Sequence, residues 1–274
     1  MNEGRDMTRY ALYMREQVRE LLTTFEPDIV WYDFSYPGIA YKGLPGKGRK
    51  DWESDQLVAL TRELRPDIIV NNRLDLPGSA DIFTPEQFQP REWVRVDGQP
   101  VVWETCQTFS GSWGYHRDET SWKSPEQLVE MLVNTVSCGG NLLMNVGPTG
   151  RGTFDRRAEE ALEVYGRWLR LHWRSVYGCT QSEFTAPTGC RFTQNGQRLY
   201  LHVFNWPFRH LHLEGFVGKV AYAQLLNDAS EVRRLEPGQH DEWSVAETGG
   251  DTLTLELPVL KPEVVVPVIE LFLK

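Results

Sequence analysis

Two segments of the sequence repeat one pattern, in which an amphipathic helix is followed by a Pro-Asp pair and a short apolar strand. The first segment places apolar residues at helical spacing over residues 7–24 and ends in the strand 29–31. The second has the same spacing over residues 51–64 and ends in the strand 68–70. A continuous apolar run is typical of a strand buried on both faces. Two such units in succession therefore predict a parallel sheet with crossover helices.

Two more strands with following helices continue the pattern. Residues 100–104 and 141–146 are apolar runs of strand length. Between them, Ser124-Pro125-Glu126-Gln127 combines an N-cap serine, a proline at the first helical position and a capping-box glutamine. A last helix is expected over residues 156–171. Four strand–helix steps predict an α/β barrel architecture.

The pattern changes after Gly178 to an alternation of apolar and polar residues. Residues 198–204 and 251–257 alternate with period two, and residues 264–273 form another apolar strand. This alternation is typical of antiparallel strands with one buried face. We therefore expect a domain of α/β type over residues 1–178 and an antiparallel β-sandwich over residues 179–274.

Composition narrows the classes of function. The net charge of −9 over 274 residues and the lack of a basic stripe in the sequence argue against binding of nucleic acid. The four cysteines lack the spacing of a zinc site, so no metal and no cofactor is expected. No signal peptide or membrane-spanning run is present in the sequence as written, which predicts a cytoplasmic protein without a membrane partner. Ten tryptophans favour, weakly, a surface on which sugars stack.

Four carboxylates stand at or after the predicted strand ends, where the loops of a parallel sheet face the active site. They are Asp33, Asp81, Glu86 and Glu104. Two carboxylates in different environments suit glycoside hydrolysis, in which one attacks the anomeric carbon and the other protonates the leaving oxygen. The simpler alternative for Asp33 is a cap of the turn that follows it. His116 is the only histidine near these residues in the sequence, which argues against a metal site.

Five motifs occur in one order that matches a known family. They are Trp31-Tyr32-Asp33, Val70-Asn71-Asn72-Arg73, Phe83-Thr84-Pro85-Glu86-Gln87, Trp103-Glu104-Thr105-Cys106 and the segment 139–148. With these motifs the sequence resembles the α-L-fucosidases of glycoside hydrolase family 29. The resemblance extends from about Gln17 into the C-terminal sandwich. It implies the last four strand–helix units of a (β/α)8 TIM-like barrel, followed by a β-sandwich.

The resemblance also implies roles for three residues around the first strand. Asp33 matches the family's nucleophile, which forms a covalent fucosyl-enzyme, and Trp31 matches an aromatic residue that lines the sugar pocket. Arg73 matches an arginine that contacts the sugar. An arginine beside a nucleophilic carboxylate favours its ionised form, which is the form that attacks. The alternative for Arg73 is an ordinary loop salt bridge.

The general acid/base is expected to be Glu86, which matches the family's Thr-Pro-Glu segment. Asp81 and Glu104 are the alternatives, and a solvated loop position is the non-catalytic interpretation of Glu86. In a retaining enzyme the two carboxyl groups lie about 5–5.5 Å apart. Trp103, Trp113 and Tyr115 are expected either to contact the leaving-group side of the substrate or to pack beneath the loops.

The sequence departs from the family at its beginning. Family members carry a His-His-Asp-Gly segment and a Glu-Trp pair upstream, and residues 1–16 match neither. By strand count only about half of an eight-stranded barrel is encoded, which leaves edge strands without partners. We therefore expect a C-terminal fragment whose partners are a fucosylated oligosaccharide or glycoconjugate and either a missing N-terminal segment or a second copy.

Three functional hypotheses follow from this sequence. The first is a retaining exo-α-L-fucosidase that acts by double displacement, with the activity of this chain alone in question. The second is a non-catalytic fragment or pseudoenzyme that binds carbohydrate or a partner chain. The third is a related retaining glycosidase with a different sugar specificity.

Overall fold

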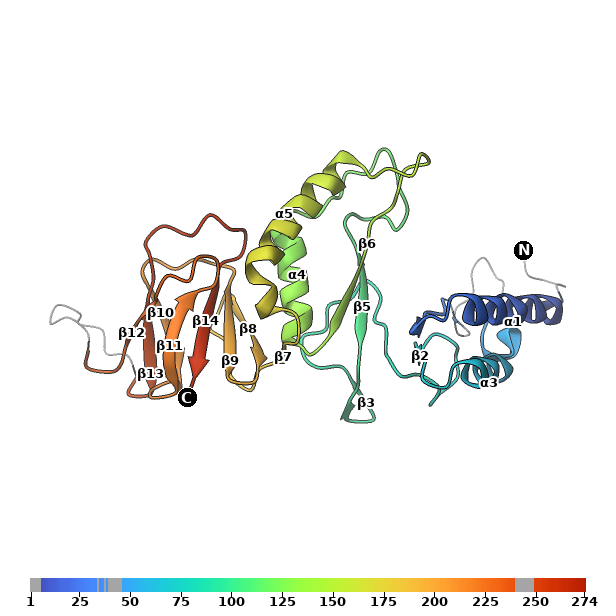
Figure 1. Cartoon of the computed structure of the whole chain (residues 1–274), viewed down its shortest axis with the longest axis horizontal. Coiled ribbons are helices and arrows are strands. Elements are labelled where there is room, and N and C mark those ends of the chain that lie inside the picture. The colour runs from blue at the N-terminus through green and yellow to red at the C-terminus, as the bar shows by residue number, and fades with distance from the viewer. Residues whose placement is uncertain (1–5, 34, 37, 39–45, 240–248) are drawn as a thin grey trace. The chain divides into compact units, whose positions relative to one another are not determined.

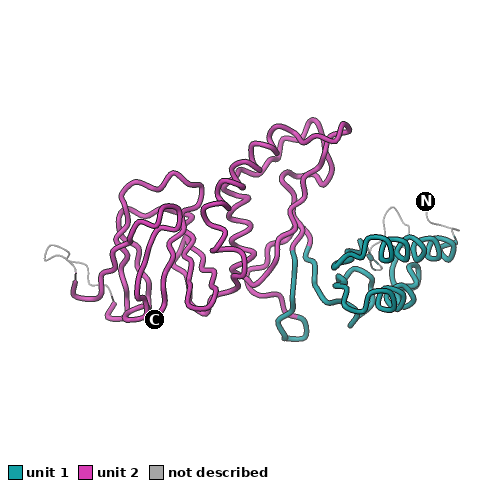
Figure 2. Tube along the Cα trace, in the orientation of Figure 1, with its two compact units in different colours: residues 1–85, 96–104 teal, residues 86–95, 105–274 magenta. Residues whose placement is uncertain are grey.

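The chain forms two compact units in the computed structural model, which describes residues 6–33, 35, 36, 38, 46–239 and 249–274 (Figure 1). The first unit comprises residues 1–85 and 96–104, and the second comprises residues 86–95 and 105–274 (Figure 2). Among the described residues, no helix has both the length and the apolar character needed to cross a bilayer.

The first unit contains the repeated helix–strand pattern that the sequence predicts. Strands β1 and β2 pair in parallel, with Ile29 opposite Ile69, which confirms the predicted parallel arrangement. The apolar faces of α1 and α3 bury Leu22 and Leu57 against these strands. The elements of this part are α1 (Met7–Thr24), β1 (Ile29–Val30), α2 (Arg49–Trp52), α3 (Ser54–Leu64) and β2 (Ile69–Val70).

A further strand position follows β2 and was not predicted. Asn71 bridges Ile82 in parallel, and Phe83 bridges Trp103 in parallel. Residues 82 and 83 therefore form a short parallel strand position between the end of β2 and Trp103. The segment is too short to show periodicity, and no helix separates it from β2. Sequence patterning had no signal with which to find it.

The third strand is predicted over residues 100–104, but the structure places it about four residues later in the sequence. The structure has a small hairpin of β3 (Arg95–Val96) and β4 (Gln99–Pro100), and the longer strand β5 runs over Glu104–Thr108. Asp97 and Gly98 form the hairpin turn with φ values of 49° and 77°. An Asp-Gly pair adopts positive φ readily at such turns, so residues 99 and 100 are drawn into the hairpin and the main strand begins later.

β5, which belongs to the second unit except for Glu104, lies beside β6 (Asn141–Asn145), and two helices, α4 (Pro125–Ser137) and α5 (Arg156–His172), follow these strands. The capping box at the start of α4 is confirmed: the Gln127 amide N–H donates to Ser124 Oγ at 3.3 Å, and the Ser124 amide N–H donates to Gln127 Oε1 at 2.8 Å. Gly139, with φ of 73°, ends the helix in the left-handed region. A Cβ there would lie 2.4 Å from the Trp93 ring, so the position requires glycine.

The rest of the second unit is the predicted antiparallel β-sandwich. A five-stranded sheet in the order β11-β14-β9-β8-β7 and a three-stranded sheet in the order β10-β13-β12 enclose an apolar core between them. Leu201 and Ile269 from one sheet and Leu213 and Leu255 from the other are almost completely buried in that core. The strands are β7 (Thr180–Gln181), β8 (Cys190–Asn195), β9 (Arg198–Val203), β10 (His210–Glu214), β11 (Val220–Leu225), β12 (Arg233–Leu235), β13 (Thr252–Glu256) and β14 (Val268–Leu273).

The boundary between compact units differs from the expected division into residues 1–178 and 179–274. The secondary structure does change class near Gly178, after the 3₁₀ turn η1 (Trp173–Ser175). However, α4 and α5 share a core with the five-stranded sheet, and the Trp168 indole N–H donates to the Val266 carbonyl at 2.7 Å. Because these helices bury their apolar faces against the sheet, they belong to the same compact unit as the sandwich.

A group of buried polar residues joins α5 and η1 to this sheet, and we call Trp168, His172, Ser175, Thr193 and His202 the histidine cluster. The His172 ring stacks on Trp168, with centroids 4.9 Å apart, and its Nδ1 lies 2.9 Å from the Trp168 carbonyl. Since a carbonyl only accepts, Nδ1 carries the proton. The Thr193 hydroxyl donates to the Ser175 carbonyl at 2.6 Å, so His202 Nε2, 2.9 Å away, donates to that hydroxyl. Burial lowers the pKa of both imidazoles, so both are neutral near pH 7.

Candidate functional site

The end of β1 is fixed by one buried asparagine. Asn71 Oδ1 accepts from the Tyr32 amide N–H at 3.0 Å, and Asn71 Nδ2 donates to the Tyr32 carbonyl at 2.8 Å. The Tyr32 side chain is buried and its hydroxyl lies 2.6 Å from Thr61 Oγ1. Because side chains alternate along an extended chain, this arrangement directs the flanking Trp31 and Asp33 to the opposite side.

Arg73 is held against Asp33 by several contacts. Its Nη1 lies 3.1 Å from Asp33 Oδ1, while Nε and Nη2 donate to the hydroxyl and the carbonyl of Thr84 at 2.9 and 3.1 Å. The guanidinium also lies over the Trp31 ring, 4.3 Å from its centroid. Asn72 Oδ1 in turn accepts from the amide and the hydroxyl of Thr84, each at 2.9 Å. The arginine is thus fixed in orientation before any ligand binds.

Exposure differs sharply between the two members of this ion pair. The Arg73 side chain is 12% exposed, and that of Asp33 is 53% exposed. The carboxylate therefore has one edge on the guanidinium and a large open surface. A carboxylate in this position can approach a ligand from solvent while its partner arginine stays in place.

Glu104 is the half-buried carboxyl of the same unit. Burial raises the pKa of Glu104, and the nearby Trp31 indole offsets a smaller part of that effect. The Trp31 Nε1–H is buried and makes no hydrogen bond of good geometry to any described residue. A carboxyl whose pKa is raised by an apolar environment keeps its proton to higher pH, which suits a proton donor. We call Trp31, Asp33, Arg73, Thr84 and Glu104 the strand-end site.

Asp81, one of the alternatives for the acid/base, forms hydrogen bonds to the backbone of β2 instead. Its Oδ2 accepts from the Val70 amide N–H at 2.7 Å and from Arg62 Nη2 at 2.5 Å. Asp81 also bonds through its own amide N–H to the Val70 carbonyl at 2.8 Å. These contacts close the edge of β2, so they favour a structural role for this carboxylate.

Three of the expected site residues, Glu86, Trp113 and Tyr115, lie in the second unit. Glu86 is exposed and bridges Cys106 in parallel at the side of β5. The next residue, Gln87, has a φ of 47° and donates its amide N–H to the Cys106 carbonyl at 3.0 Å. The backbone around Glu86 is therefore fixed to β5 by hydrogen bonds.

The loop that carries Trp113 and Tyr115 is pinned to the end of β6. Asn145 Nδ2 donates to the Trp113 carbonyl at 2.5 Å. A Cβ at Gly147 would lie 2.6 Å from the backbone of Gly114 and Tyr115, so only glycine permits this close approach. The two aromatic side chains are 38% and 41% exposed.

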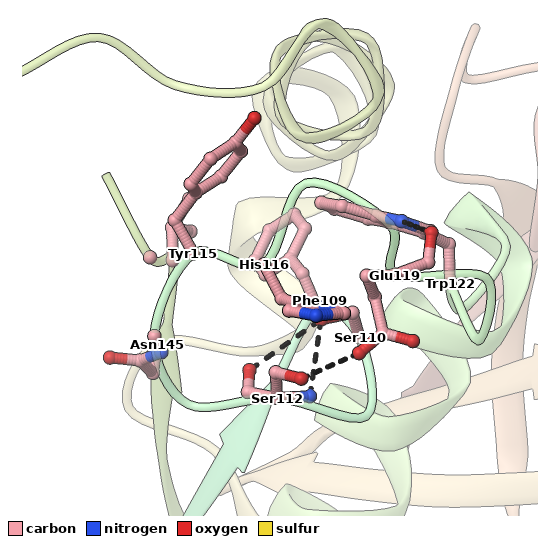
Figure 3. A pocket seen from close by; sticks show the side chains of 11 residues that line it. Phe109, Ser110, Ser112, Tyr115, His116, Glu119, Trp122 and Asn145 are labelled. Carbon is pink, nitrogen blue, oxygen red and sulfur yellow. Dashed lines mark hydrogen bonds between the residues drawn. The ribbon is translucent and has the colours of Figure 1, made fainter. Parts of the chain in front are cut away.

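A small cavity lies behind this loop (Figure 3). Its volume is about 10 Å³, which is room for a single water molecule. Glu119 at its edge accepts from Ser112 and Ser121, and these hydrogen bonds lower its pKa to about 2. In Figure 3 the Tyr115 ring points away from Ser112 and Glu119. The cavity is too small for a sugar, so any contact of Trp113 or Tyr115 with a ligand would use their exposed faces.

Trp103 differs from these two rings because it is completely buried, with 0% exposure. Of the two roles expected for it, the structure favours packing and offers a ligand no surface.

Within the described part of the chain, no three histidine, cysteine, aspartate or glutamate side chains are grouped as metal ligands. Sequence reasoning missed Asn71 and Thr84. The sequence signal that could have identified these two residues as part of the site is their position, since each is polar and directly follows a short apolar segment.

Comparison with known proteins gives a consistent match. The family model described as alpha-L-fucosidase matches residues 1–173. The plasma alpha-L-fucosidase of Pongo abelii is 30% identical over 257 residues, a stretch that covers 89% of this chain and 51% of that protein. The chain therefore spans about half the length of the curated relative.

Solved structures agree with the sequence comparison. Alpha-L-fucosidase isoenzyme 1 from Paenibacillus thiaminolyticus matches with a TM-score of 0.87 and 34% identity, over 99% of this chain and 64% of that one. The Thermotoga maritima alpha-fucosidase in complex with a mechanism-based inhibitor matches with a TM-score of 0.73 and 27% identity, over 96% and 57% of the two chains.

Proposed function

Because the chain belongs to the α-L-fucosidase family, we propose that it hydrolyses terminal α-L-fucosyl residues of oligosaccharides or glycoconjugates with retention of configuration. The parallel pairing of β1 with β2, and the parallel bridges Asn71–Ile82, Phe83–Trp103 and Glu86–Cys106, support the finer assignment to a (β/α)8 barrel. Since the chain spans about half of its curated relatives, the activity proposed is that of the barrel to which these strands contribute.

The observation that carries this proposal is the arrangement of Asp33 on Arg73. In the first step, an Asp33 oxygen attacks the anomeric carbon as the glycosidic C–O bond breaks and an acid protonates the leaving oxygen. In the second step, the same acid, now a base, takes a proton from water, which attacks the anomeric carbon and releases Asp33. The fixed guanidinium holds one Asp33 oxygen in place and leaves the open side of the carboxylate for attack.

For the acid/base, we assign Glu86 and keep Glu104 as the alternative. The Thr-Pro-Glu segment and the strand-pinned backbone at Cys106 support Glu86. The raised pKa of the Glu104 carboxyl supports the alternative, because a general acid has to hold its proton near neutral pH. Trp31, beneath the Arg73 guanidinium, is assigned to the wall of the sugar pocket.

The proposal is tested with aryl α-L-fucosides beside aryl glycosides of other sugars, and with NMR of the first sugar anomer released. Hydrolysis of the fucoside alone, with the α-anomer of fucose appearing first, is the expected result. Turnover of a different glycoside with retention would favour the related glycosidase. Binding of fucose without any turnover would favour the non-catalytic carbohydrate-binding protein.

A further inference from the structure

A second cavity in the first unit has no role in the reaction described above. Its volume is about 790 Å³, within the range of small-molecule sites. It lies between the start of α1 and a second group of residues, which comprises Tyr36 and Lys47 before α2 and Trp52 at the end of α2. We call it the aromatic cavity, and its main lining residues are Arg9, Tyr10, Tyr13, Tyr36, Lys47 and Trp52.

Aromatic rings on two segments form its apolar wall. The Tyr10 ring lies 6.4 Å from Tyr13 and 6.1 Å from Trp52, at interplanar angles of 48° and 59°. Because the rings are tilted, they do not cover one another's faces. Tyr10 is 49% exposed and Tyr13 is 60% exposed. Large aromatic surfaces of this kind, left open to solvent beside a cavity, are typical of a binding surface.

The charged groups around the cavity balance one another. Lys47, only 8% exposed, has its ammonium 3.6 Å from Asp51. Arg9 and Asp6 supply one further charge of each sign at the lining. An anionic or cationic ligand would therefore gain little from this site, whereas a neutral ligand with hydroxyl groups could use these side chains as hydrogen-bond donors and acceptors.

The aromatic cavity is tied to the chain segment that carries Asp33. The Trp52 indole N–H donates to Ser35 Oγ at 3.1 Å, and the Tyr36 amide N–H donates to the Lys47 carbonyl at 2.9 Å. Tyr36 is three residues beyond Asp33, so their Cα atoms lie within about 11 Å of each other. A ligand of two or three sugar rings is long enough to span a separation of that size.

From these observations we propose that the aromatic cavity binds a neutral pyranose ring of the glycan from which the fucose is cleaved. A pyranose has an apolar C–H face that matches the Tyr10 and Tyr13 rings and a rim of hydroxyls that matches Lys47 and Arg9. The proposal rests on the proposed function, and it makes oligosaccharides rather than small aryl fucosides the preferred substrates.

The direct test measures binding of lactose and N-acetyllactosamine to the whole chain by saturation-transfer NMR and calorimetry. A binding measurement requires no turnover. Tyr13→Ala is expected to weaken binding about tenfold, the size of one lost aromatic contact. Phe25→Ala is the matched control, since Phe25 is an exposed ring at the other end of α1 and does not line the cavity. Thermal unfolding of each variant checks that it folds.

Failure to bind either disaccharide, or equal binding by wild type and Tyr13→Ala, overturns the proposal. So does sedimentation that shows a dimer lost only in Tyr13→Ala, which would make the cavity wall an interface between copies.

Kinetics separates this proposal from the proposed function. Tyr13→Ala is expected to lower kcat/KM for a fucosylated trisaccharide about tenfold more than for an aryl fucoside. An unchanged ratio of the two kcat/KM values, with hydrolysis still dependent on Asp33, would overturn the cavity proposal alone. Hydrolysis that survives Asp33→Ala would overturn the proposed mechanism instead.

Discussion

The strand-end site and the histidine cluster both place polar side chains against a tryptophan ring, yet their charge states differ. In the strand-end site, Arg73 lies over Trp31 and pairs with an Asp33 side chain that is 53% exposed. In the histidine cluster, His172 stacks on Trp168 and both members are almost completely buried. Water and an ion partner keep the first site charged, whereas burial without an ion partner keeps the imidazole neutral. The exposed carboxylate of the first is open to a ligand, whereas the buried groups of the second contact only the protein.

The sharpest test of this difference is Asp33→Ala in the active protein. Removal of the carboxylate that we assign as the nucleophile is expected to lower kcat by about three orders of magnitude or more. The free energy of unfolding should change by less than about 1 kcal/mol, because the ion pair is half exposed. Steady-state kinetics and urea unfolding measure the two effects. Azide should restore turnover with an inverted product, and activity that survives the substitution would contradict the assignment.

The acid/base assignment predicts the next largest effect. Glu86→Ala is expected to lower kcat/KM about 100-fold to 10,000-fold for substrates with poor leaving groups, and much less for aryl fucosides with good ones. Glu104→Gln is the comparison variant, since its carboxyl is the alternative donor. Equal losses on good and poor leaving groups in Glu86→Ala would remove Glu86 from the role. A leaving-group dependence in Glu104→Gln would assign the role to Glu104.

The buried histidines predict acid sensitivity of the fold. Burial lowers the pKa of His172 to about 4 and that of His202 to about 3, whereas the unfolded chain titrates near 6.5. Below pH 6.5 the unfolded state therefore binds protons that the folded state does not bind, and the free energy of unfolding decreases as the pH falls. The loss is on the order of 2 kcal/mol per histidine between pH 6.5 and about pH 5.

Urea unfolding at a series of pH values measures this slope. His202→Gln should be less stable than wild type at neutral pH but should lose less stability on acidification. His116→Gln, at an exposed position, is the control and should keep the wild-type slope. If His202→Gln and wild type lose the same amount, the histidine cluster is not the source of the acid sensitivity.

The smallest effect is expected from Arg73→Lys, which keeps the positive charge of the strand-end site. A lysine cannot contact Asp33 and both oxygens of Thr84 at once, so the carboxylate loses orientation rather than its charge partner. We expect a loss of about tenfold in kcat/KM with a nearly unchanged Tm. A loss as large as that of Asp33→Ala would show that the arginine itself takes part in the chemistry.

Part of the fold could be predicted because its signals are local in the sequence. The helix over residues 7–24 and the capping box at Ser124 follow from spacing and caps within a few residues, and both are present. The strand at residues 100–104 was misplaced because the Asp97-Gly98 turn competes for the same residues. The bridge at Ile82 was missed because so short a pairing depends on its neighbours in the sheet rather than on its own pattern.

The candidate site divides in the same way. The sequence by itself determined the types of element, the carboxylate that follows the first strand and, through five ordered motifs, the family. Only the tertiary structure decided that Arg73 rests on Thr84, that Trp103 is buried and that Trp168 binds a carbonyl 98 residues away. The physical reason is that periodicity is a property of neighbours along the chain. Burial and hydrogen-bond partners depend on residues that only folding brings together.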